Sequence, residues 1–279
     1  MIRLASENDI VALRNIWQVC FGDTDDYLDL YFNNCFNIGH TYVYLDGNKP
    51  ISMLTILPVD YHINGRNEKL GYIYAAATLP QFQGSGIMAK MLEFAKMLAK
   101  KQGLYGLCLV PGGEELFSYY KKHGFNTTFY HRVGEYAYNV VKVADTSINK
   151  LSASEYIEKR DSFSRKYNFL HFSSEMNVYI AKELEFTGHF FISGSEFYAC
   201  IRENHGQKYI RELICKDENL ENALNVICSW YKADIKVRLP SDIEFAETKL
   251  TPYAMTWIVE KAKLTKETDC IKYANLLLD

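Results

Sequence analysis

Gly84, Ser85 and Gly86 lie between an apolar run and a helical pattern, and their small side chains leave the backbone accessible. The first amides of a helix lack intrahelical partners and sit at the positive end of the helix dipole. Glycines before such a helix let an anion reach those amides, so this spacing favours the binding of a phosphate group. A tight turn without a ligand is the alternative that the three residues alone leave open.

Two familiar phosphate-binding loops do not fit this stretch. It contains no Gly-Lys-Ser/Thr, which a P-loop requires. No third glycine follows Gly84 and Gly86 at the spacing of a dinucleotide-binding loop. Any phosphate site here therefore belongs to another class.

The elements that would position this loop are predicted from apolar periodicity and turn residues. Two helices come first, the first of them opened by a capping box at 6–9. Three strands follow, the last two joined by the hairpin signal Asn64-Gly65. A helix, a buried strand, a short helix and a last strand complete the order. The predicted ranges are 10–20, 27–32, 41–46, 51–63, 69–78, 87–102, 104–110, 114–123 and 130–141.

The rest of the chain repeats this order. A polar connector at 142–150 is the best boundary, and it divides the chain into domains 1–141 and 151–279. Beyond it, two helices, three strands, a helix and two strands are predicted at 154–165, 173–185, 189–193, 197–203, 208–215, 220–231, 233–239 and 253–260. The repetition favours a structural duplication within the α/β class, with a mixed α+β sheet. A single α+β domain of coincidentally similar order is the alternative.

Composition limits the classes of function. The net charge is −3 and no basic block occurs, which argues against a nucleic-acid partner. No apolar run approaches the roughly 20 residues of a membrane span, and the first residues lack a secretory segment. The seven cysteines are scattered without a C-x-x-C pair, which indicates reduced thiols in a cytoplasmic protein, with neither a disulfide frame nor a metal site. Assembly into a homo-oligomer is left open.

Two motifs resemble one known family. Gln81 to Gly86, Gln-Phe-Gln-Gly-Ser-Gly, resembles the Q/R-x-x-G-x-G/A signature of the GNAT superfamily of N-acetyltransferases. Leu116 to Phe125, LFSYYKKHGF, resembles the family's final helix with its Tyr-x-x-x-Gly-Phe ending. The order of elements around both motifs also agrees, and the resemblance covers roughly residues 1–141. Gln81 and Gln83 depart from the family, since many members carry arginine there.

The resemblance implies acetyl-CoA as the cosubstrate and no metal. In such proteins the strand before the loop exposes backbone groups to pantetheine, and the loop amides hold the pyrophosphate. The strands at 72–78 and 104–110 would diverge and admit the thioester, helped by Pro111. With the glutamines in place of arginine, binding would rest more on the amides. The implied cofactor-binding residues are Ala77, Thr78, Leu79, Gln83, Gly84, Ser85, Gly86, Ile87, Met88 and Phe117.

The resemblance also implies a catalytic acid. Tyr120, four residues before Gly124, matches the family's acid tyrosine, and a phenol is a suitable donor to a departing thiolate. Tyr119 points about 100° away on a helix and is not interchangeable with it. The alternative for Tyr120 is an ordinary amphipathic tyrosine that packs Phe117 against the sheet.

The acceptor is expected to be a primary amine of a small molecule or a peptide. Tyr72 and Tyr74 alternate on the strand beside the expected thioester site, and Tyr27 and Tyr31 lie on the second predicted helix. These four tyrosines are candidate substrate contacts, with ordinary strand and helix aromatics as the alternative. No residue identifies itself as general base, which leaves that role open, with water as one candidate.

The second half lacks the cofactor loop. Its corresponding stretch, Lys216-Asp217-Glu218-Asn219, has no glycine, and its acids would repel a pyrophosphate. Tandem halves with one active site also resemble the enhanced-intracellular-survival type acetyltransferases. The expected function is therefore an acetyl-CoA-dependent N-acetyltransferase that uses direct attack in a ternary complex. A non-catalytic acyl-CoA-binding or scaffold protein with this fold is the alternative.

Overall fold

The computed structural model describes residues 1–63, 65–139, 147–164, 168–243, 248–259 and 272–274. These residues fall into two compact units that are not consecutive stretches of chain. The first unit contains Met1–Tyr61, Gly65–Thr127 and the described residues from Ala254 onward, up to 259. The second contains Thr128–Tyr253 and residues 62–63 and 272–274. Asn64 and residues 141–146 of the expected boundary region lie outside the described residues.

The first unit is built on a mixed sheet with the strand order β1-β2-β3-β4-β5-β13. β4 and β5 are parallel, with α3 as the crossover between them, whereas β1, β2 and β3 run antiparallel to their neighbours. The sequence analysis missed β1, because three residues are too few to show an alternating pattern. The strands are β1 (Ile2–Leu4), β2 (Thr41–Asp46), β3 (Lys49–Ile63), β4 (Arg66–Thr78), β5 (Gly106–Leu109) and β13 (Thr248–Ile258).

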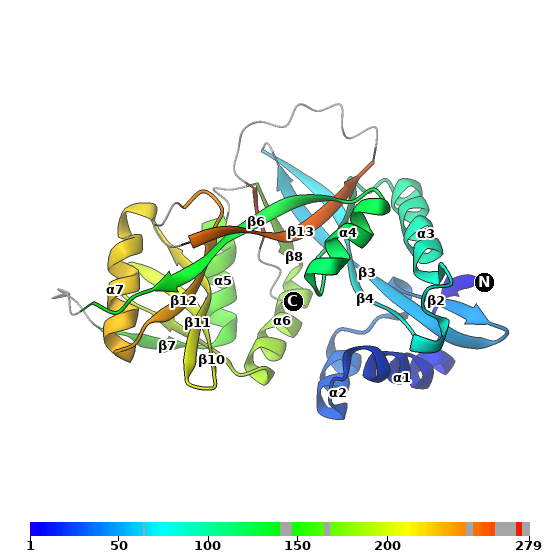
Figure 1. Ribbon diagram of the computed structural model, residues 1–279, viewed down its shortest axis with the longest axis horizontal. Helices are drawn as coiled ribbons and strands as arrows, with labels where there is room; N and C mark the ends of the chain where they lie inside the picture. The colour runs from blue at the N-terminus through cyan, green and yellow to red at the C-terminus, as the bar shows by residue number, and fades with distance from the viewer. Residues whose placement is uncertain (64, 140–146, 165–167, 244–247, 260–271, 275–279) are drawn as a thin grey trace. The chain divides into compact units, whose positions relative to one another are not determined.

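Helices cover both faces of this sheet, as the alternation along β4 requires. Ile73 belongs to the core cluster formed with α3 (Ile87–Gln102) and α4 (Glu114–Lys122). Its neighbour Tyr74 points the other way, to the rings of α1 (Ile10–Phe21) and α2 (Asp25–Asn34). Figure 1 shows α1 and α2 on one side of these strands and α3 on the other.

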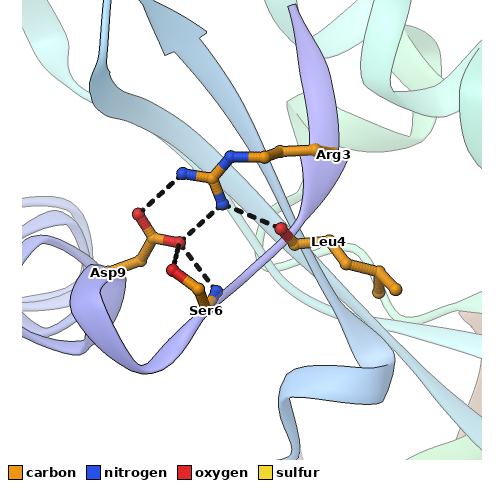
Figure 2. A network of polar contacts seen from close by, with 4 residues as sticks. All are labelled: Arg3, Leu4, Ser6 and Asp9. Atoms are coloured by element: carbon orange, nitrogen blue, oxygen red, sulfur yellow. Dashed lines mark hydrogen bonds and ion pairs between the residues drawn. The ribbon is translucent and has the colours of Figure 1, made fainter.

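The start of α1 is fixed by the predicted capping box. Asp9 accepts hydrogen bonds from the backbone amide of Ser6 at 2.7 Å and from its hydroxyl at 2.8 Å. Arg3 forms an ion pair with the same carboxylate at 2.7 Å, as Figure 2 shows. The Asp9 side chain is buried, and the hydrogen bond from Arg3 is the largest cause that lowers its pKa to about 2.

The strand that completes the first sheet comes from the far end of the chain. Met255, Thr256, Trp257 and Ile258 of β13 pair antiparallel with residues 106–109 of β5. The sequence analysis expected a strand near 253–260 and assigned it to the second domain. In the structure the portion from Ala254 onward belongs to the first unit. β6 (Asn126–Tyr136), expected at 130–141 in the first domain, pairs instead with β12 in the second unit.

The second unit repeats the plan of the first. Its sheet has the order β6-β12-β11-β10-β9-β7, with β11 and β12 parallel across α7. The sequence analysis missed the short strands β7, β8 and β14. The other elements are β7 (Asn149–Leu151), α5 (Ala153–Ser164), β8 (Asn168–Phe172), α6 (Ser174–Phe186), β9 (His189–Ser193), β10 (Phe197–Asn204), β11 (Gln207–Cys215), α7 (Leu220–Tyr231), β12 (Ile235–Pro240) and β14 (Lys272–Tyr273).

The two units share irregularities as well as element order. Parallel pairing of β11 with β12 ends at Ile210 and Val237, although β11 continues to Cys215. The register of β11 on β10 also shifts between Ile210 and Glu212, which marks a bulge. β4 shows both features, as described below. The structure confirms the predicted mixed α/β class. No helix among the described residues is long and apolar enough to cross a bilayer.

Candidate active site

The candidate site begins where β4 and β5 separate. The two strands pair only from Leu70 with Gly106 to Tyr72 with Cys108, and β4 then continues to Thr78. β5 ends at Leu109, two residues before Pro111. The last part of β4 therefore has no ladder partner on its β5 side. This register agrees with the divergence expected between 72–78 and 104–110.

A bulge lies in the part of β4 beyond its pairing with β5. Ala75 has a φ of 50°, which is unusual for a residue with a Cβ and costs about 1–3 kcal/mol. The extra residue shifts the alternation, since Ile73 and Ala76 both contact the core on the α3 face. Tyr72 and Tyr74 stay on the opposite face, with ring centres 5.9 Å apart. The bulge thus changes which side chains of β4 lie beside the point where β4 and β5 separate.

The loop after β4 presents free amides. Gly84 and Gly86 have φ values of 73° and 77°, and a Cβ on either would meet nothing within 4 Å. Glycine is thus required for conformation rather than for lack of space. Among the described residues, the amides of Gly84, Ser85 and Gly86 donate no hydrogen bond, whereas the Gln83 amide donates to Pro80 at 3.2 Å.

The loop leads directly into α3, whose dipole adds to these amides. Gly86 is the residue before the helix, and Ile87 and Met88 are its first two residues. Their amides have no partner within the helix because the first intrahelical bond from this end is Lys90 to Gly86. The side chains of Ile87 and Met88 pack in the core cluster. In the described part of the chain, five consecutive amides thus donate no hydrogen bond at the positive end of a helix.

The end of β4 is already partly engaged. The carbonyl oxygen of Ala77 accepts from the Ser52 hydroxyl at 2.8 Å, and the Leu79 amide donates to Ile51 at 3.0 Å. These two groups therefore face β3. The carbonyl oxygen of Thr78 accepts from the side-chain amide of Gln83 at 2.9 Å. The Gln83 side chain thus binds the strand end, a role that the sequence pattern did not suggest.

A further group at this strand end is Cys20 of α1. Its thiol contacts the carbonyl oxygen of Thr78 at 3.4 Å. Burial is the first cause that raises the pKa of this thiol. The sequence analysis missed the contact, because a cysteine within an apolar helical pattern is typical of a core residue.

Tyr120 lies in the last turn of α4 and is 9% exposed. Its ring contacts those of Tyr119 and Phe125, with centres 5.4 and 6.0 Å away. Burial, and secondarily Tyr119, raises the pKa of Tyr120 to about 12. Its hydroxyl donates to no group in the described part of the chain. Tyr120 shares one core cluster with Ile73 of β4 and Leu109 of β5, and half-buried Phe117 packs against that cluster.

Residues 1–134 match the family model of the acetyltransferase (GNAT) domain. These residues contain the loop, the separated strands and Tyr120. The N-terminal part of this chain is thus similar to the GNAT acetyltransferase domain. The family match supports acetyltransferase activity.

Solved structures extend the likeness of fold beyond the GNAT domain. A probable N-acyltransferase from Enterococcus faecalis has a TM-score of 0.76 at 15% identity, with 93% of this chain and 72% of that chain covered. A GCN5-related N-acetyltransferase from Anabaena variabilis has a TM-score of 0.71 at 15% identity, with 94% and 73% covered. Eis1 from Mycobacterium abscessus has a TM-score of 0.69 at 9% identity, with 94% and 74% covered. No curated protein sequence matches the chain.

These neighbours show that the fold of both units is shared. The coverage, above nine-tenths of this chain, reaches far beyond the GNAT domain model.

On the other face of the GNAT domain's sheet, aromatic rings gather between α1, α2 and β4. The hydroxyls of Tyr27 and Tyr74 lie 3.3 Å apart, and the Trp17 ring is 5.7 Å from that of Tyr74. The indole of Trp17 donates to Asp23 at 2.7 Å. Trp17 was not predicted as a site residue, because a tryptophan at helical spacing is typical of core.

The four candidate acceptor tyrosines come together, but their exposure differs. Tyr31 is 1% exposed and Tyr72 is 2% exposed, so both are core residues. Burial raises the pKa of Tyr31, whose hydroxyl contacts that of Thr55 at 3.4 Å. Tyr27 and Tyr74 are half-buried. Only this second pair is accessible to a ligand without movement of the domain.

Cysteine chemistry finds little support in the described residues. Cys108 pairs with Tyr72 where the strands separate, but it is fully buried, and burial raises the pKa of its thiol. The described cysteines are free thiols. No group of three metal-ligating side chains occurs among the described residues.

The second unit presents a different site at the corresponding place. A 3-10 turn at Asp217–Asn219 precedes α7, and it holds no glycine. Where β11 leaves β12, Glu212 is buried and pairs with Arg160 at 2.8 Å. The hydroxyl of Tyr156 donates to the same carboxylate at 2.8 Å. Buried polar groups of this chain therefore pair with one another at the second bulge.

Proposed function

We propose that this protein is an acetyl-CoA-dependent N-acetyltransferase that transfers the acetyl group directly to a primary amine. The observation that carries the proposal is the loop from Gly84 to Gly86. Its two left-handed glycines and the start of α3 present amides that donate no hydrogen bond within the described chain, an arrangement suited to a pyrophosphate. The amides of Ile87 and Met88 would complete the cradle.

The separated strands would receive the rest of the cosubstrate. β4 has no ladder partner on its β5 side beyond Tyr72, so its backbone is available to an amide-containing chain such as pantetheine. Ala77 and Leu79 use the carbonyl and amide named above toward β3, and the Thr78 carbonyl already accepts from Gln83 and Cys20. The Thr78 amide and the bulge at Ala75 are therefore the better candidates for this contact. Phe117 would add apolar contact from α4.

Tyr120 would act as the acid for the departing thiolate. A phenol with a pKa of about 12 stays protonated throughout the neutral range, so its proton is available for donation. A thiol has a pKa near 8.5, so full transfer of the proton from this phenol to the departing thiolate is energetically unfavourable. Attack releases a proton from the amine, and this proton can restore the phenol through water. Tyr120 would therefore donate a hydrogen bond to sulfur as negative charge develops there.

Direct transfer is favoured over a covalent acetyl-enzyme. An acyl-cysteine route needs a thiolate, and burial keeps Cys108 protonated. The acceptor amine must be neutral when it attacks, because an alkylammonium with a pKa near 10.4 has no free electron pair. The half-buried Tyr27 and Tyr74, together with Trp17, would line the path of that amine.

Two measurements test the proposal in order. Thermal melting with saturating acetyl-CoA should raise Tm, because a ligand at 100 times its Kd adds about 2.7 kcal/mol to stability. Release of free thiol should then be followed with polyamines, aminoglycosides, amino acids and peptides as acceptors. Absence of any Tm shift would exclude acetyl-CoA as the cosubstrate. A Tm shift without turnover of any amine would favour a non-catalytic acyl-CoA-binding protein.

A further inference from the structure

Lys96 of α3 is a buried lysine with an unusual set of neighbours. It is 8% exposed, and its ammonium group donates to the Glu93 carboxylate at 2.7 Å and to the backbone carbonyl of His123. The centres of the Phe125 and Trp257 rings each lie 5.8 Å from Nζ. A buried ammonium is costly unless such partners compensate it, so this charge is held in one place.

The carbonyl that Lys96 binds belongs to the turn that ends α4. His123 is the residue after the last helical turn, and its amide donates to the carbonyl oxygen of Tyr120 at 3.0 Å. The amide of Phe125 donates to the same oxygen at 3.1 Å. A cation at this end of a helix also interacts favourably with the helix dipole. Lys96 therefore binds the turn whose backbone amides donate to the carbonyl oxygen of Tyr120.

Trp257 of β13 covers this contact. Gly124 has a φ of 79°, and a Cβ there would lie 3.6 Å from the Trp257 ring and 3.8 Å from Nζ of Lys96. Trp257 is itself fixed by pairing with Leu107 of β5. The turn after Tyr120 thus contacts Lys96 of α3 and the indole of Trp257 from β13. These residues all belong to the first unit.

We propose that Lys96 is a positioning residue for Tyr120, acting through the carbonyl of His123. The inference rests on the proposed function, because it assigns Tyr120 the role of acid. Lys96 holds the last turn of α4 in a single conformation, and this fixes the direction of the phenol. A displacement of about 1 Å in a catalytic group can cost 10²-fold in rate. Binding of acetyl-CoA at the loop does not require this contact.

The test compares Lys96→Met with Lys100→Met. Lys100 lies on the same helix and over the same Trp257 ring, at 5.7 Å, but it is exposed and makes no bond to the turn. We expect Lys96→Met to lower kcat by about 10-fold or more, with KM for acetyl-CoA within twofold of wild type. Lys100→Met should leave both constants unchanged. Lys96→Arg, which keeps a charged donor, should restore part of the lost kcat.

Hydrogen exchange supplies a readout that does not depend on activity. Peptides covering residues 114–125 should exchange faster in Lys96→Met than in Lys100→Met, while those covering 79–88 should not change. If Lys96→Met does not fold, Lys96→Gln, which also removes the charge, carries the same comparison. Unchanged exchange in α4 together with unchanged kcat would overturn the proposal. A wild-type protein that acetylates no amine would overturn the proposed function, whereas faster exchange in α4 would still support the Lys96 contact.

Discussion

The side-chain amide of Gln83 lies 2.9 Å from the carbonyl oxygen of Thr78 and donates a hydrogen bond to it. This bond joins the glycine loop to the end of β4, so the two parts of the proposed cosubstrate site are connected. The glutamine stands where many members of the family carry arginine. It therefore contributes order to the loop instead of a positive charge.

Removal of this connection should weaken binding of acetyl-CoA. A hydrogen bond of this kind contributes about 1 kcal/mol, so Gln83→Ala should raise the Kd about fivefold. Gln81→Ala is the matched control, because Gln81 is exposed and makes no hydrogen bond within the described chain. Titration calorimetry of both variants gives the comparison. Equal effects in the two variants would show that the Thr78 contact has no part in binding.

The left-handed conformation of Gly86 gives a second prediction. Gly86→Ala should cost about 1–2 kcal/mol because of its φ of 77°, although the new methyl group meets no atom. Tm should fall by about 2–8 °C, and the stabilisation by acetyl-CoA should shrink. Gly112→Ala is the control, since Gly112 also has open space but no positive φ. A Gly86→Ala protein that binds acetyl-CoA as wild type does would contradict the cradle.

Tyr120→Phe should separate catalysis from binding. Loss of the hydroxyl should lower kcat by about 10²–10⁴-fold and leave the Tm shift with acetyl-CoA intact. Because the pKa of Tyr120 is about 12, its ionisation should not produce an alkaline decline in kcat below about pH 11. Tyr119→Phe, one residue away, is the matched control. Unchanged turnover in Tyr120→Phe would remove the assigned acid.

Tyr27 and Tyr74 should affect the acceptor rather than the cosubstrate. Tyr74→Phe removes a hydroxyl that lies 3.3 Å from that of Tyr27, and both residues are half-buried. We expect KM for the amine to change severalfold while KM for acetyl-CoA stays constant. Tyr72→Phe is the control, because its ring is 2% exposed. A change in KM for acetyl-CoA alone would show that Tyr27 and Tyr74 do not contact the acceptor amine.

Asp9 should make stability depend on acidic pH. Its folded pKa of about 2 lies below the unfolded value near 3.9, so its contribution is complete above about pH 4. The contribution is lost as the pH falls through 2, and we expect it to amount to about 1–2 kcal/mol. Chemical denaturation of Asp9→Asn and wild type at several pH values measures it. The difference between them should be largest near neutral pH and should disappear near pH 2.

Local chemistry explains what was predictable from the sequence. Gly84 and Gly86 before an amphipathic helix, and Tyr120 before Gly124, are patterns of neighbouring residues, and the structure places them as expected. The Ser6–Asp9 capping box is equally local and is confirmed.

Contacts between distant residues were not predictable. Neither the pairing of Trp257 with β5 nor the contact of Lys96 with His123 leaves a periodic pattern, since each depends on the three-dimensional path of the chain. The bulge at Ala75 was missed for a related reason, because alanine carries no mark of a positive φ. Burial of Tyr31 and Tyr72 also depends on how α2 packs over β4. Sequence periodicity placed the candidate residues on their helices and strands but did not predict their exposure.

The position of β13 in the first sheet has a consequence for biosynthesis. The ribosome makes β1 to β5 and α4 early, but the residues that pair with the free edge of β5 emerge more than a hundred residues later. Until then the nascent chain carries an unprotected strand edge, and the turn after Tyr120 lacks its indole cover. The first unit therefore completes its fold only after Met255–Ile258 have been translated.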